Sequence, residues 1–387
     1  MTTSKYEQRG VSAGKEDVHA AIKDLDKGLF PNAFCKILPD MVGKDSDFVN
    51  IMHADTAGTK TSLAYLYWKE TGDLSVWEGI VQDSLVMNLD DMAAAGMCQD
   101  FVISSTIGRN KNHINGDVVA TLINAQKKIA DKLAEYGIKI HLAGGETADV
   151  GDIVRTADVG FTAFGRMPKK DVLPIDIQDG DVVVALASYG QSSYENKYNS
   201  GIGSNGLTFA RHETLIKAYA DKYPESFDPA LNEEVVYTGK SFLTDKWGDE
   251  ELNIGQLLLS PTRTYLPVIK TLMEKLRDKM HGIIHCTGGG LTKVLHFSEG
   301  LTIYKGNPLP VPPVFQMIQS QTNTPWKEMY EVFNMGQRLE VYLPKEYAQE
   351  VIDISKSFNI HAQLIGVCQK GKKQVVVSGM DGEYVYE

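Results

Sequence analysis

The sequence predicts an α/β (α+β) protein of two domains, and three observations lead to this expectation. The chain has 387 residues, which is more than one ordinary hydrophobic core accommodates. In its N-terminal part, apolar runs of strand length alternate with longer segments of helical periodicity. A polar, turn-rich stretch at residues 165–171 then precedes a second series of elements. We therefore expect an N-terminal domain of residues 1–166 and a C-terminal domain of residues 167–387.

The N-terminal domain is expected to hold a mixed sheet covered by helices. Asn115 or Asp117 can cap the second helix, and Gly137 can end it. Four strands are too few to close a barrel and leave apolar edges such as Phe101–Ile103 unpaired. We therefore expect a homodimer formed through residues of roughly 45–165. The predicted strands are Val49–Ala54, Phe101–Thr106, Lys139–Ala143 and Ala157–Phe164, and the predicted helices are Asp73–Ala95 and Asn115–Tyr136.

The C-terminal domain is expected to be an α+β layer. Its predicted strands are Asp181–Ala187, Gly282–His285, Arg338–Leu343, Ala362–Val367 and Gln374–Val377. Its predicted helices are Leu207–Tyr219, Pro261–Met280 and Lys345–Phe358. No internal repeat is visible in either domain.

Composition excludes several classes of protein. A net charge of −11 argues against a nucleic-acid or anionic-membrane partner. No apolar run approaches the roughly 18 residues that span a bilayer, and Met1–Gly10 is polar rather than a secretory signal. The four cysteines lie far apart, as expected for reduced thiols in a cytoplasmic protein.

Three glycine-rich polar segments carry most of the functional information: residues 55–60, 144–149 and 287–290. Each follows an apolar run of strand type. Glycines past a strand end let backbone N–H groups approach an anion, although a simple turn explains any single segment equally well. Carboxylates beside such glycines favour a Mg²⁺ ion that bridges to phosphate. Together the segments predict a metal–nucleotide site.

The predicted helix Asp73–Ala95 is apolar on nearly all sides and should be buried. It carries Asp83, Asp90 and Asp91 along one face. Buried carboxylates are costly unless they ligate a metal or pair with a cation. We expect at least one of these carboxylates to coordinate a metal or another cation. The alternative is that they pair with Lys or Arg from elsewhere in the chain, or lie at the exposed end of the helix.

Two familiar motifs fail on inspection. Gly58–Thr61 resembles a P-loop, but Thr59 separates the glycine from Lys60 and the earlier glycine is missing. Gly201–Gly206 matches G-x-G-x-x-G, yet some dozen polar residues separate it from the preceding strand, which a dinucleotide fold does not allow. Ser204, Asn205 and Gly206 still precede a predicted helix, where a phosphate oxygen could bind or where the residues merely cap the helix.

The motifs taken together resemble the phosphoribosylformylglycinamidine cyclo-ligase (aminoimidazole ribonucleotide synthetase) family. They occur in the order and approximate spacing of that family, from about Tyr6 to the C-terminus. Individually they are shared with the formylglycinamidine synthase, hydrogenase-maturation, selenophosphate synthetase and thiamine-phosphate kinase families. The matching segments are Tyr6–Val11, Asp55–Lys60, Gly144–Asp149, Ser204–Gly206, Ser260–Tyr265, His285–Gly290 and Phe333–Gly336.

The resemblance implies that the N-terminal sheets of two subunits pair into a barrel, with ATP bound near that interface. It also implies an ATP-dependent closure of the imidazole ring in purine biosynthesis. The substrate's formyl oxygen attacks the γ-phosphate, a nitrogen then attacks the iminophosphate, and phosphate leaves. Charge neutralisation and alignment of the triphosphate would supply most of the catalysis.

Site residues follow from the residue chemistry and the resemblance. Lys60 and His285 are the catalytic candidates. Lys60 would be the cation beside the transferred phosphate. His285 would form a hydrogen bond to the substrate or move a proton, with a purely structural role for this histidine as the alternative. The nucleotide-binding candidates are Gly58, Thr59, Lys60, Gly144, Gly145 and Thr147. The ribonucleotide-binding candidates are Ser204, Asn205, Gly206, Thr287, Gly288, Gly289 and Gly290. The Mg²⁺ candidates are Asp55, Asp83, Asp91 and Glu146.

Three departures from the family pattern bear on substrate choice. Residues 27–39 contain only Gly28 where the family has a glycine-rich segment, the family's Asn-Asp pair is Asp90-Asp91, and residues 189–206 are longer than the family's turn. Another ATP-dependent enzyme of the superfamily, selenophosphate synthetase-like or formylglycinamidine synthase-like, is one alternative. The others are a non-catalytic nucleotide-binding paralogue and a nicotinamide-dependent oxidoreductase.

Overall fold

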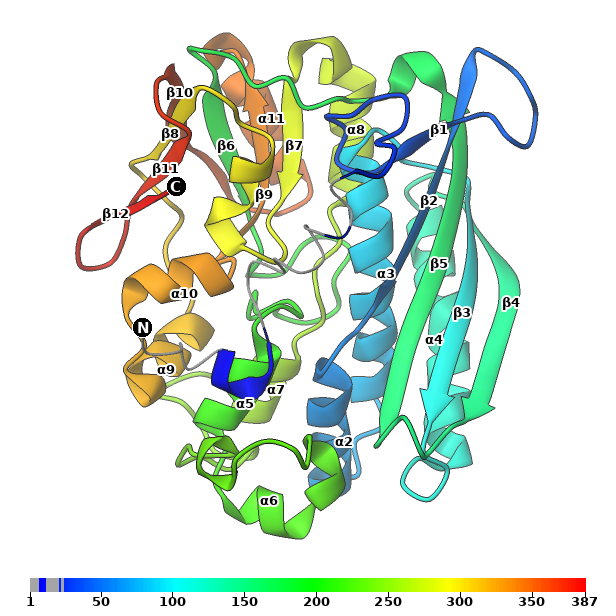
Figure 1. Ribbon diagram of the computed structural model, residues 1–387, viewed down its shortest axis with the longest axis vertical. Helices are drawn as coiled ribbons and strands as arrows, with labels where there is room; N and C mark the ends of the chain where they lie inside the picture. Colours follow the sequence, from blue (N-terminus) through cyan, green and yellow to red (C-terminus); the bar gives the residue numbers. More distant parts are fainter. Residues whose placement is uncertain (1–6, 12–20, 22–23) are drawn as a thin grey trace.

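The computed structural model describes residues 7–11, 21 and 24–387, and it contains two sheets side by side (Figure 1). Tyr6, the first residue of the motif Tyr6–Val11, lies outside the described residues. The α/β (α+β) fold with two sheets is confirmed. Helix α3 (Val76–Ala94) lies between the sheets, and α2 (Lys60–Thr71) lies at the bottom of the view, packed against α3, α5 (Leu207–Thr214) and α7 (Ile254–Leu259).

The N-terminal sheet has five strands in the order β1-β2-β5-β3-β4. Only β3 and β4 are parallel. Helices α3 and α4 (Gly116–Ala134) lie behind the sheet in Figure 1, and Asn115 caps α4 as predicted, its Oδ1 accepting from the Val118 N–H at 3.1 Å. The strands are β1 (Ile37–Pro39), β2 (Phe48–Thr56), β3 (Phe101–Arg109), β4 (Ile140–Asp149) and β5 (Ala157–Pro168).

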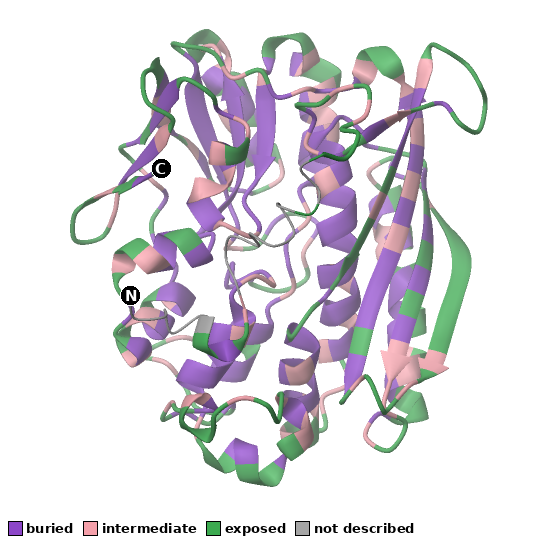
Figure 2. Cartoon of the chain, viewed as in Figure 1, coloured by how far each residue is buried: buried purple, intermediate pink, exposed green. Residues whose placement is uncertain are grey.

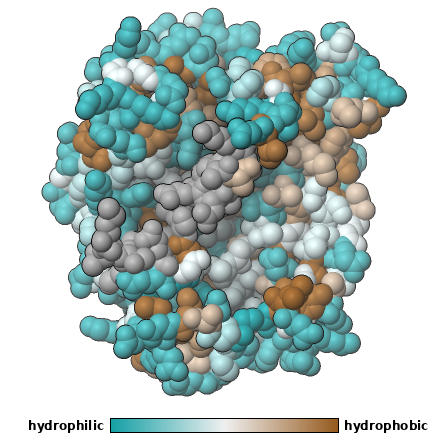
Figure 3. Space-filling view, in the orientation of Figure 1, coloured by the Kyte–Doolittle hydropathy of each residue, from teal (hydrophilic) through white to brown (hydrophobic). Residues whose placement is uncertain are grey.

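The opposite face of this sheet carries no helix of the described chain (Figure 1). Along β3 the residues alternate between buried and exposed, which is the pattern of a sheet covered on one face. Met52, Val102 and Leu142 are exposed apolar side chains on its strands. Figure 3 shows pale and hydrophobic residues over this side of the view, in contrast to the hydrophilic opposite side.

Helix α3 is buried nearly all round, as predicted (Figure 2). It packs against β2 and β5 on one side and against α8 (Leu266–Leu276) and β7 (Gly282–His285) of the C-terminal half on the other. Asp83 and Asp90 are fully buried, and the Asp91 side chain is 15% exposed. The carboxylates of α3 therefore face the junction between the two halves.

The C-terminal sheet has seven strands in the order β12-β11-β8-β10-β6-β9-β7. Its central strands β6 and β9 are buried throughout (Figure 2). The strands are β6 (Val182–Ala187), β7 (Gly282–His285), β8 (Leu301–Lys305), β9 (Gln337–Leu343), β10 (Ala362–Lys370), β11 (Gln374–Ser378) and β12 (Glu383–Tyr386). The helices are α5 (Leu207–Thr214), α6 (Ala218–Lys222), α7 (Ile254–Leu259), α8 (Leu266–Leu276), α9 (Pro313–Thr322), α10 (Trp326–Val332) and α11 (Ala348–Ser357).

Several element predictions need correction. The second glycine segment does not end a strand, because β4 continues through Gly144 and Gly145 to Asp149. A bulge opposite Ser104 accommodates the extra residue, with Gly144 at φ +85°. The turn predicted at 165–171 is wrong for its first residues, since β5 runs to Pro168. The predicted helices Leu207–Tyr219 and Pro261–Met280 are each shorter, and 260–265 is an irregular loop.

Two chemical properties of the described chain bear on its class. None of its helices is both long and apolar enough to cross a membrane. All four cysteines are unpaired and buried. Burial raises the pKa of the Cys35, Cys98, Cys286 and Cys368 thiols, so none of them is an activated nucleophile.

Candidate active site

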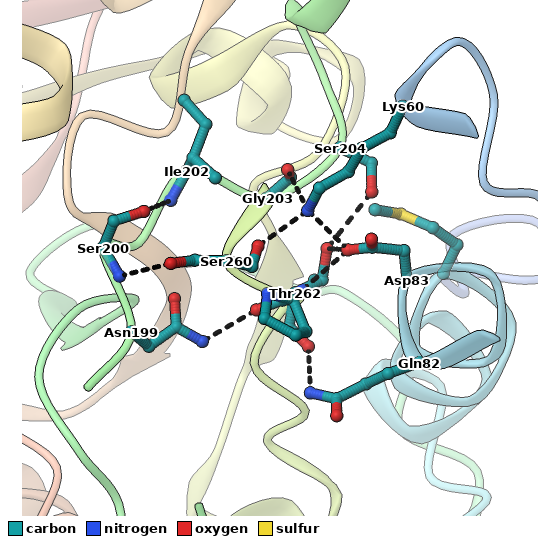
Figure 4. A network of polar contacts seen from close by, with 12 residues as sticks. Lys60, Gln82, Asp83, Asn199, Ser200, Ile202, Gly203, Ser204, Ser260 and Thr262 are labelled. Carbon is teal, nitrogen blue, oxygen red and sulfur yellow. Dashed lines mark hydrogen bonds and ion pairs between the residues drawn. The ribbon is translucent and has the colours of Figure 1, made fainter. Parts of the chain in front are cut away.

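A buried ammonium group joins the two halves of the molecule (Figure 4). Lys60 is the first residue of α2 and is fully buried. Its Nζ donates to Asp83 Oδ1 at 2.9 Å, to Gly203 O at 3.0 Å and to Ser260 O at 2.7 Å. An ammonium has three protons, and all three are used. To bind phosphate, as the sequence predicts, Lys60 would have to release one of these acceptors.

Asp83 is the centre of this polar cluster. Its Oδ1 also accepts from the Thr262 N–H at 2.7 Å and from the Thr262 hydroxyl at 2.6 Å. The Thr262 hydroxyl lies 3.2 Å from the hydroxyl of Ser204. Burial lowers the pKa of Lys60, and the negative charge of Asp83 opposes that shift. The pair therefore fixes the loops that carry Gly203 and Thr262 against α2 and α3.

The loop 201–206 is shaped by glycines and by an asparagine beneath it. Gly203 and Gly206 have φ values of +72° and +79°, which side chains other than hydrogen rarely allow. The Asn334 amide donates to Gly201 O at 2.9 Å and to Ile202 O at 3.2 Å. The motif Phe333–Gly336 thus supports the predicted ribonucleotide-binding loop from below.

The structure brings two predicted ribonucleotide-binding loops together. Residues 287–290 follow β7 and lead into the short 3₁₀ helix η6 (Gly290–His296). A Cβ at Gly288 would lie 3.8 Å from the amide nitrogen of Asn205. Gly289 and Gly290 have positive φ, at +89° and +49°. Asn205 Oδ1 is buried and has no hydrogen-bond partner within the described chain. A buried oxygen left unpaired beside a glycine loop indicates a place for a ligand donor.

His285 lies in a buried chain of hydrogen bonds between the domains. Its Nε2 accepts from Arg338 Nε at 3.1 Å, which places the imidazole proton on Nδ1. That nitrogen donates to Asp91 Oδ1 at 2.6 Å. His53 Nε2 lies 3.6 Å from the other oxygen of Asp91. His285 is fully buried, so this arrangement favours the alternative in which it holds Asp91 in position.

Asp90 caps the start of α8 from the other domain. Its oxygens accept from the Thr264 hydroxyl at 2.6 Å and from the Tyr265 N–H at 2.7 Å. Burial raises the pKa of Asp90 to about 6, against the opposing effects of His285 and these hydrogen bonds. The Asp90–Asp91 pair that departs from the family pattern thus links α3 to two elements of the C-terminal half.

A recess also opens at the N-terminus of α2. A cavity of about 490 Å³ is lined by Gly58, Thr59, Thr208 and Arg211, among others. The Thr59 hydroxyl lies 2.7 Å from that of Thr208, the second residue of α5. Arg211 is 3% exposed, and its Nε has no partner within the described chain. The N-terminus of a helix favours an anion, and the cavity is lined both by arginines and by the carboxylates of Asp158, Glu225 and Asp228.

The predicted nucleotide-binding residues Gly144, Gly145 and Thr147 lie elsewhere. They belong to β4, the edge strand of the N-terminal sheet, where they are exposed. In Figure 1 this edge is remote from the C-terminal half. Gly145 packs closely against Ser105 of β3, where a Cβ would collide with backbone. These residues can meet a nucleotide only at the outer edge of the sheet.

The four predicted metal ligands do not surround one ion within the chain. Asp83 is paired with Lys60, and Asp91 with His285. Asp55 and Gly145 lie in the same row of the sheet, three strand spacings apart, which corresponds to roughly 14 Å. Glu146 therefore cannot share an ion with Asp55 in one subunit. The described residues also contain no cluster of three or more His, Cys, Asp or Glu side chains suited to a metal.

Sequence reasoning missed the residues that assemble this site. Thr262 donates to the predicted residue Asp83, and Arg338 donates to the predicted residue His285. Asn334 donates to the backbone of the loop 201–206. Arg263 is 1% exposed and binds Glu195 as well as the backbone oxygens of Ala187, Tyr189 and Gly190. The motifs 260–265 and 333–336 contain all of these residues except Arg338, but they carry no sign of which side chains face one another.

Comparison with known families covers nearly the whole described chain. The sequence profile "AIR synthase related protein, N-terminal domain" matches residues 41–167. The profile "AIR synthase related protein, C-terminal domain" matches residues 178–379.

Proteins named phosphoribosylformylglycinamidine cyclo-ligase are similar along most of the sequence. The protein from Methanococcus vannielii is 31% identical over 275 residues, which is 68% of this chain and 67% of its own. That from Methanocaldococcus jannaschii is 29% identical over 83% of this chain and 78% of its own. That from Carboxydothermus hydrogenoformans is 27% identical over 98% of this chain and all of its own.

Solved structures share the fold at low identity. The AaThiL complex with AMPPCP and TMP has a TM-score of 0.57 at 13% identity, covering 96% of this chain and 97% of its own. A chain of the HypE-HypF complex has a TM-score of 0.56 at 14% identity, covering 97% of this chain and 99% of its own. T. maritima PurL with FGAR has a TM-score of 0.53 at 11% identity, covering 96% and 49%. These similarities establish the fold.

Proposed function

This chain belongs to the AIR synthase related family, as an enzyme of the phosphoribosylformylglycinamidine cyclo-ligase group, and we propose that it closes an imidazole ring at the expense of ATP. In the proposed reaction, formylglycinamidine ribonucleotide and ATP give aminoimidazole ribonucleotide, ADP and phosphate. The oxygen lost from the substrate leaves as part of the phosphate. This reaction belongs to purine biosynthesis, in agreement with the names of the relatives.

The observation that carries the proposal is the meeting of loops 201–206 and 287–290 beside an unpaired buried oxygen. Gly288 approaches Asn205, and Asn205 Oδ1 lacks a donor within the described chain. Positive-φ glycines in both loops leave backbone N–H groups open to close approach. A ribonucleotide supplies both kinds of partner, because its phosphate accepts from N–H groups and its ribose hydroxyls can donate to Asn205.

In this proposal the described residues mainly bind and orient. Ser204, Asn205, Gly206 and residues 287–290 hold the ribonucleotide. Asp91 is fixed by His285, which is fixed in turn by Arg338, so the carboxylate is presented in one orientation. Alignment of two substrates by rigid groups can supply a large part of the rate enhancement.

We assign Gly58, Thr59 and Thr208 to an anionic group of a substrate. They line the cavity at the N-terminus of α2, with Arg211 beside them. Lys60 then acts through the loops it holds, and its direct contact with the transferred phosphate stays a prediction. A cytoplasmic location likewise stays a prediction.

A homodimer through the open face of the N-terminal sheet is part of the proposal. This face exposes Met52 and Val102, and β4 leaves one sheet edge unpaired within the described chain. Burying apolar strands against a second copy removes both features. Nucleotide binding by Gly144, Gly145 and Thr147 fits this dimer, since these residues lie on that edge. The residues of one chain do not fit a Mg²⁺ site built from all four carboxylates.

Product analysis tests the reaction. The chain is incubated with formylglycinamidine ribonucleotide and Mg·ATP, and the ribonucleotide fraction is followed by mass spectrometry. The proposal expects a product lighter than the substrate by the mass of one water molecule, formed only with ATP. A phosphorylated ribonucleotide as the final product, or no change in the ribonucleotide, would show another activity.

A further inference from the structure

The segment 189–206, which is longer than the corresponding turn of the family, borders another cavity. This cavity is distinct from the one at the N-terminus of α2 and lies outside the proposed active site. This cavity of about 330 Å³ lies between α3 and α4 and is closed on one side by residues 194–199. Its volume is in the range of small-molecule sites. On α3 it touches Leu85, Val86 and Leu89. Leu85 and Leu89 lie more than a quarter turn around the helix from Asp83, Asp90 and Asp91.

The floor of the cavity is apolar. Leu85, Val86 and Leu89 come from α3, Ala125 and Ile129 come from α4, and Tyr194 comes from the long segment. Tyr194 is held in place because its hydroxyl donates to Thr264 O at 2.6 Å. These side chains offer an occupant dispersion contacts and no fixed charge, so they suit an aromatic or branched apolar group.

The mouth of the cavity is basic, although the chain as a whole carries a net charge of −11. Lys128, Lys132 and Lys197 line it. Lys128 and Lys132 make exposed ion pairs with Glu78 and Glu135, which are weak because water screens them. Lys197 is exposed and has no ion pair in the described part of the chain. Two carboxylates also line the cavity, Glu78 and Glu195, and both are engaged, Glu78 by Lys128 and Glu195 by Arg263.

We propose that this cavity is a binding site for a small amphipathic anion, with an aromatic or branched apolar body and one carboxylate, sulfonate or phosphate group. The apolar body lies on the α3–α4 floor, and the anionic group lies at the lysine mouth. Residues 194–199, which close the cavity on one side, are connected to the proposed active site. The Asn199 amide donates to Pro261 O at 2.7 Å, next to Thr262. An occupant would therefore brace the loop that carries Thr262.

Isothermal titration calorimetry of the full chain with 8-anilinonaphthalene-1-sulfonate tests the site without reference to the reaction. We expect saturable binding of one probe per subunit. Ile129→Trp fills the floor and should abolish binding. Ile123→Trp is the matched control, because Ile123 lies on the same helix, is 50% exposed and does not line the cavity. It should bind the probe as the unmodified chain does.

A charge variant keeps the test decisive if the filled cavity perturbs folding. Lys197→Gln lies on the surface and should weaken probe binding about two- to fivefold, the effect of one exposed charge pair. Lys127→Gln, an exposed lysine of α4 outside the lining, should leave the affinity unchanged. Equal affinity for Ile129→Trp and the unmodified chain, or for Lys197→Gln and Lys127→Gln, would overturn the proposal.

Discussion

Replacing Lys60 by Met should destabilise the fold strongly, because it removes a charge that compensates a buried carboxylate. Lys60 and Asp83 have side chains with no exposed surface. Lys60→Met keeps the length of the side chain but leaves Asp83 with donors from Thr262 alone. Gly203 O and Ser260 O also lose the Nζ donor. Leaving one member of a buried ion pair uncompensated costs about 3–5 kcal/mol.

A double-mutant cycle separates this effect from lost packing. Asp83→Asn keeps an oxygen for Thr262 and removes the charge, so Lys60→Met/Asp83→Asn lacks the uncompensated carboxylate. The double variant should recover about 2 kcal/mol relative to the sum of the single changes. Lys69→Met, at the exposed end of the same helix, should change stability by no more than about 0.5 kcal/mol.

The assay is urea unfolding followed by circular dichroism and by tryptophan fluorescence. An unfolding free energy of Lys60→Met within about 1 kcal/mol of that of the unmodified chain, or a cycle without coupling to Asp83, would refute a compensating role for Lys60. A variant of normal stability that no longer turns over ATP would instead identify Lys60 as the phosphate ligand that the sequence predicts.

The remaining predictions concern a pKa, two site residues and the dimer. Because burial raises the pKa of Asp90 to about 6, the folded chain binds more protons than the unfolded chain between about pH 4 and 6. Stability should therefore fall by up to about 3 kcal/mol as the pH rises through this window, and urea midpoints of Asp90→Asn should lack this slope. Gly289→Val, at φ +89°, should raise the KM for the ribonucleotide about tenfold and that for ATP less, in steady-state kinetics. Asp55→Asn should lower kcat by about 100-fold with a nearly unchanged melting temperature, since Asp55 is exposed on β2, and near-normal ADP formation would reject its role. Val102→Glu should convert a dimer into a monomer in light scattering, whereas an unmodified chain that is monomeric at micromolar concentration would exclude the dimer.

Much of the fold could be predicted because its strands and long helices have clear periodicity. The strand β7 and the buried helix α3 are the best examples. Helix α2 was missed because Gly58–Lys60 was interpreted as a phosphate loop, although the apolar run after it is helical. The starts of α9 and α10 could have been found from Pro313 at the first helical position and Pro325 before the second helix. The length of β4 could not be predicted, because in the sequence a glycine that permits a bulge cannot be distinguished from a glycine that ends a strand.

The site was predictable in its parts and not in its assembly. The motifs identified the two loops that meet at Asn205 and Gly288. They gave no sign that Lys60 has three internal acceptors, because two of these are backbone oxygens more than 140 residues away. Nor did they show that Asp55 and Glu146, although in adjacent rows of the sheet, lie three strands apart, since strand order depends on tertiary pairing.

The most direct test of the proposed reaction is ADP release by the full chain, measured with and without formylglycinamidine ribonucleotide. We expect ADP to form only when the ribonucleotide is present, with one ADP for each aminoimidazole ribonucleotide produced. ADP release at the same rate without the ribonucleotide, or no ADP release with it, would contradict the proposed function.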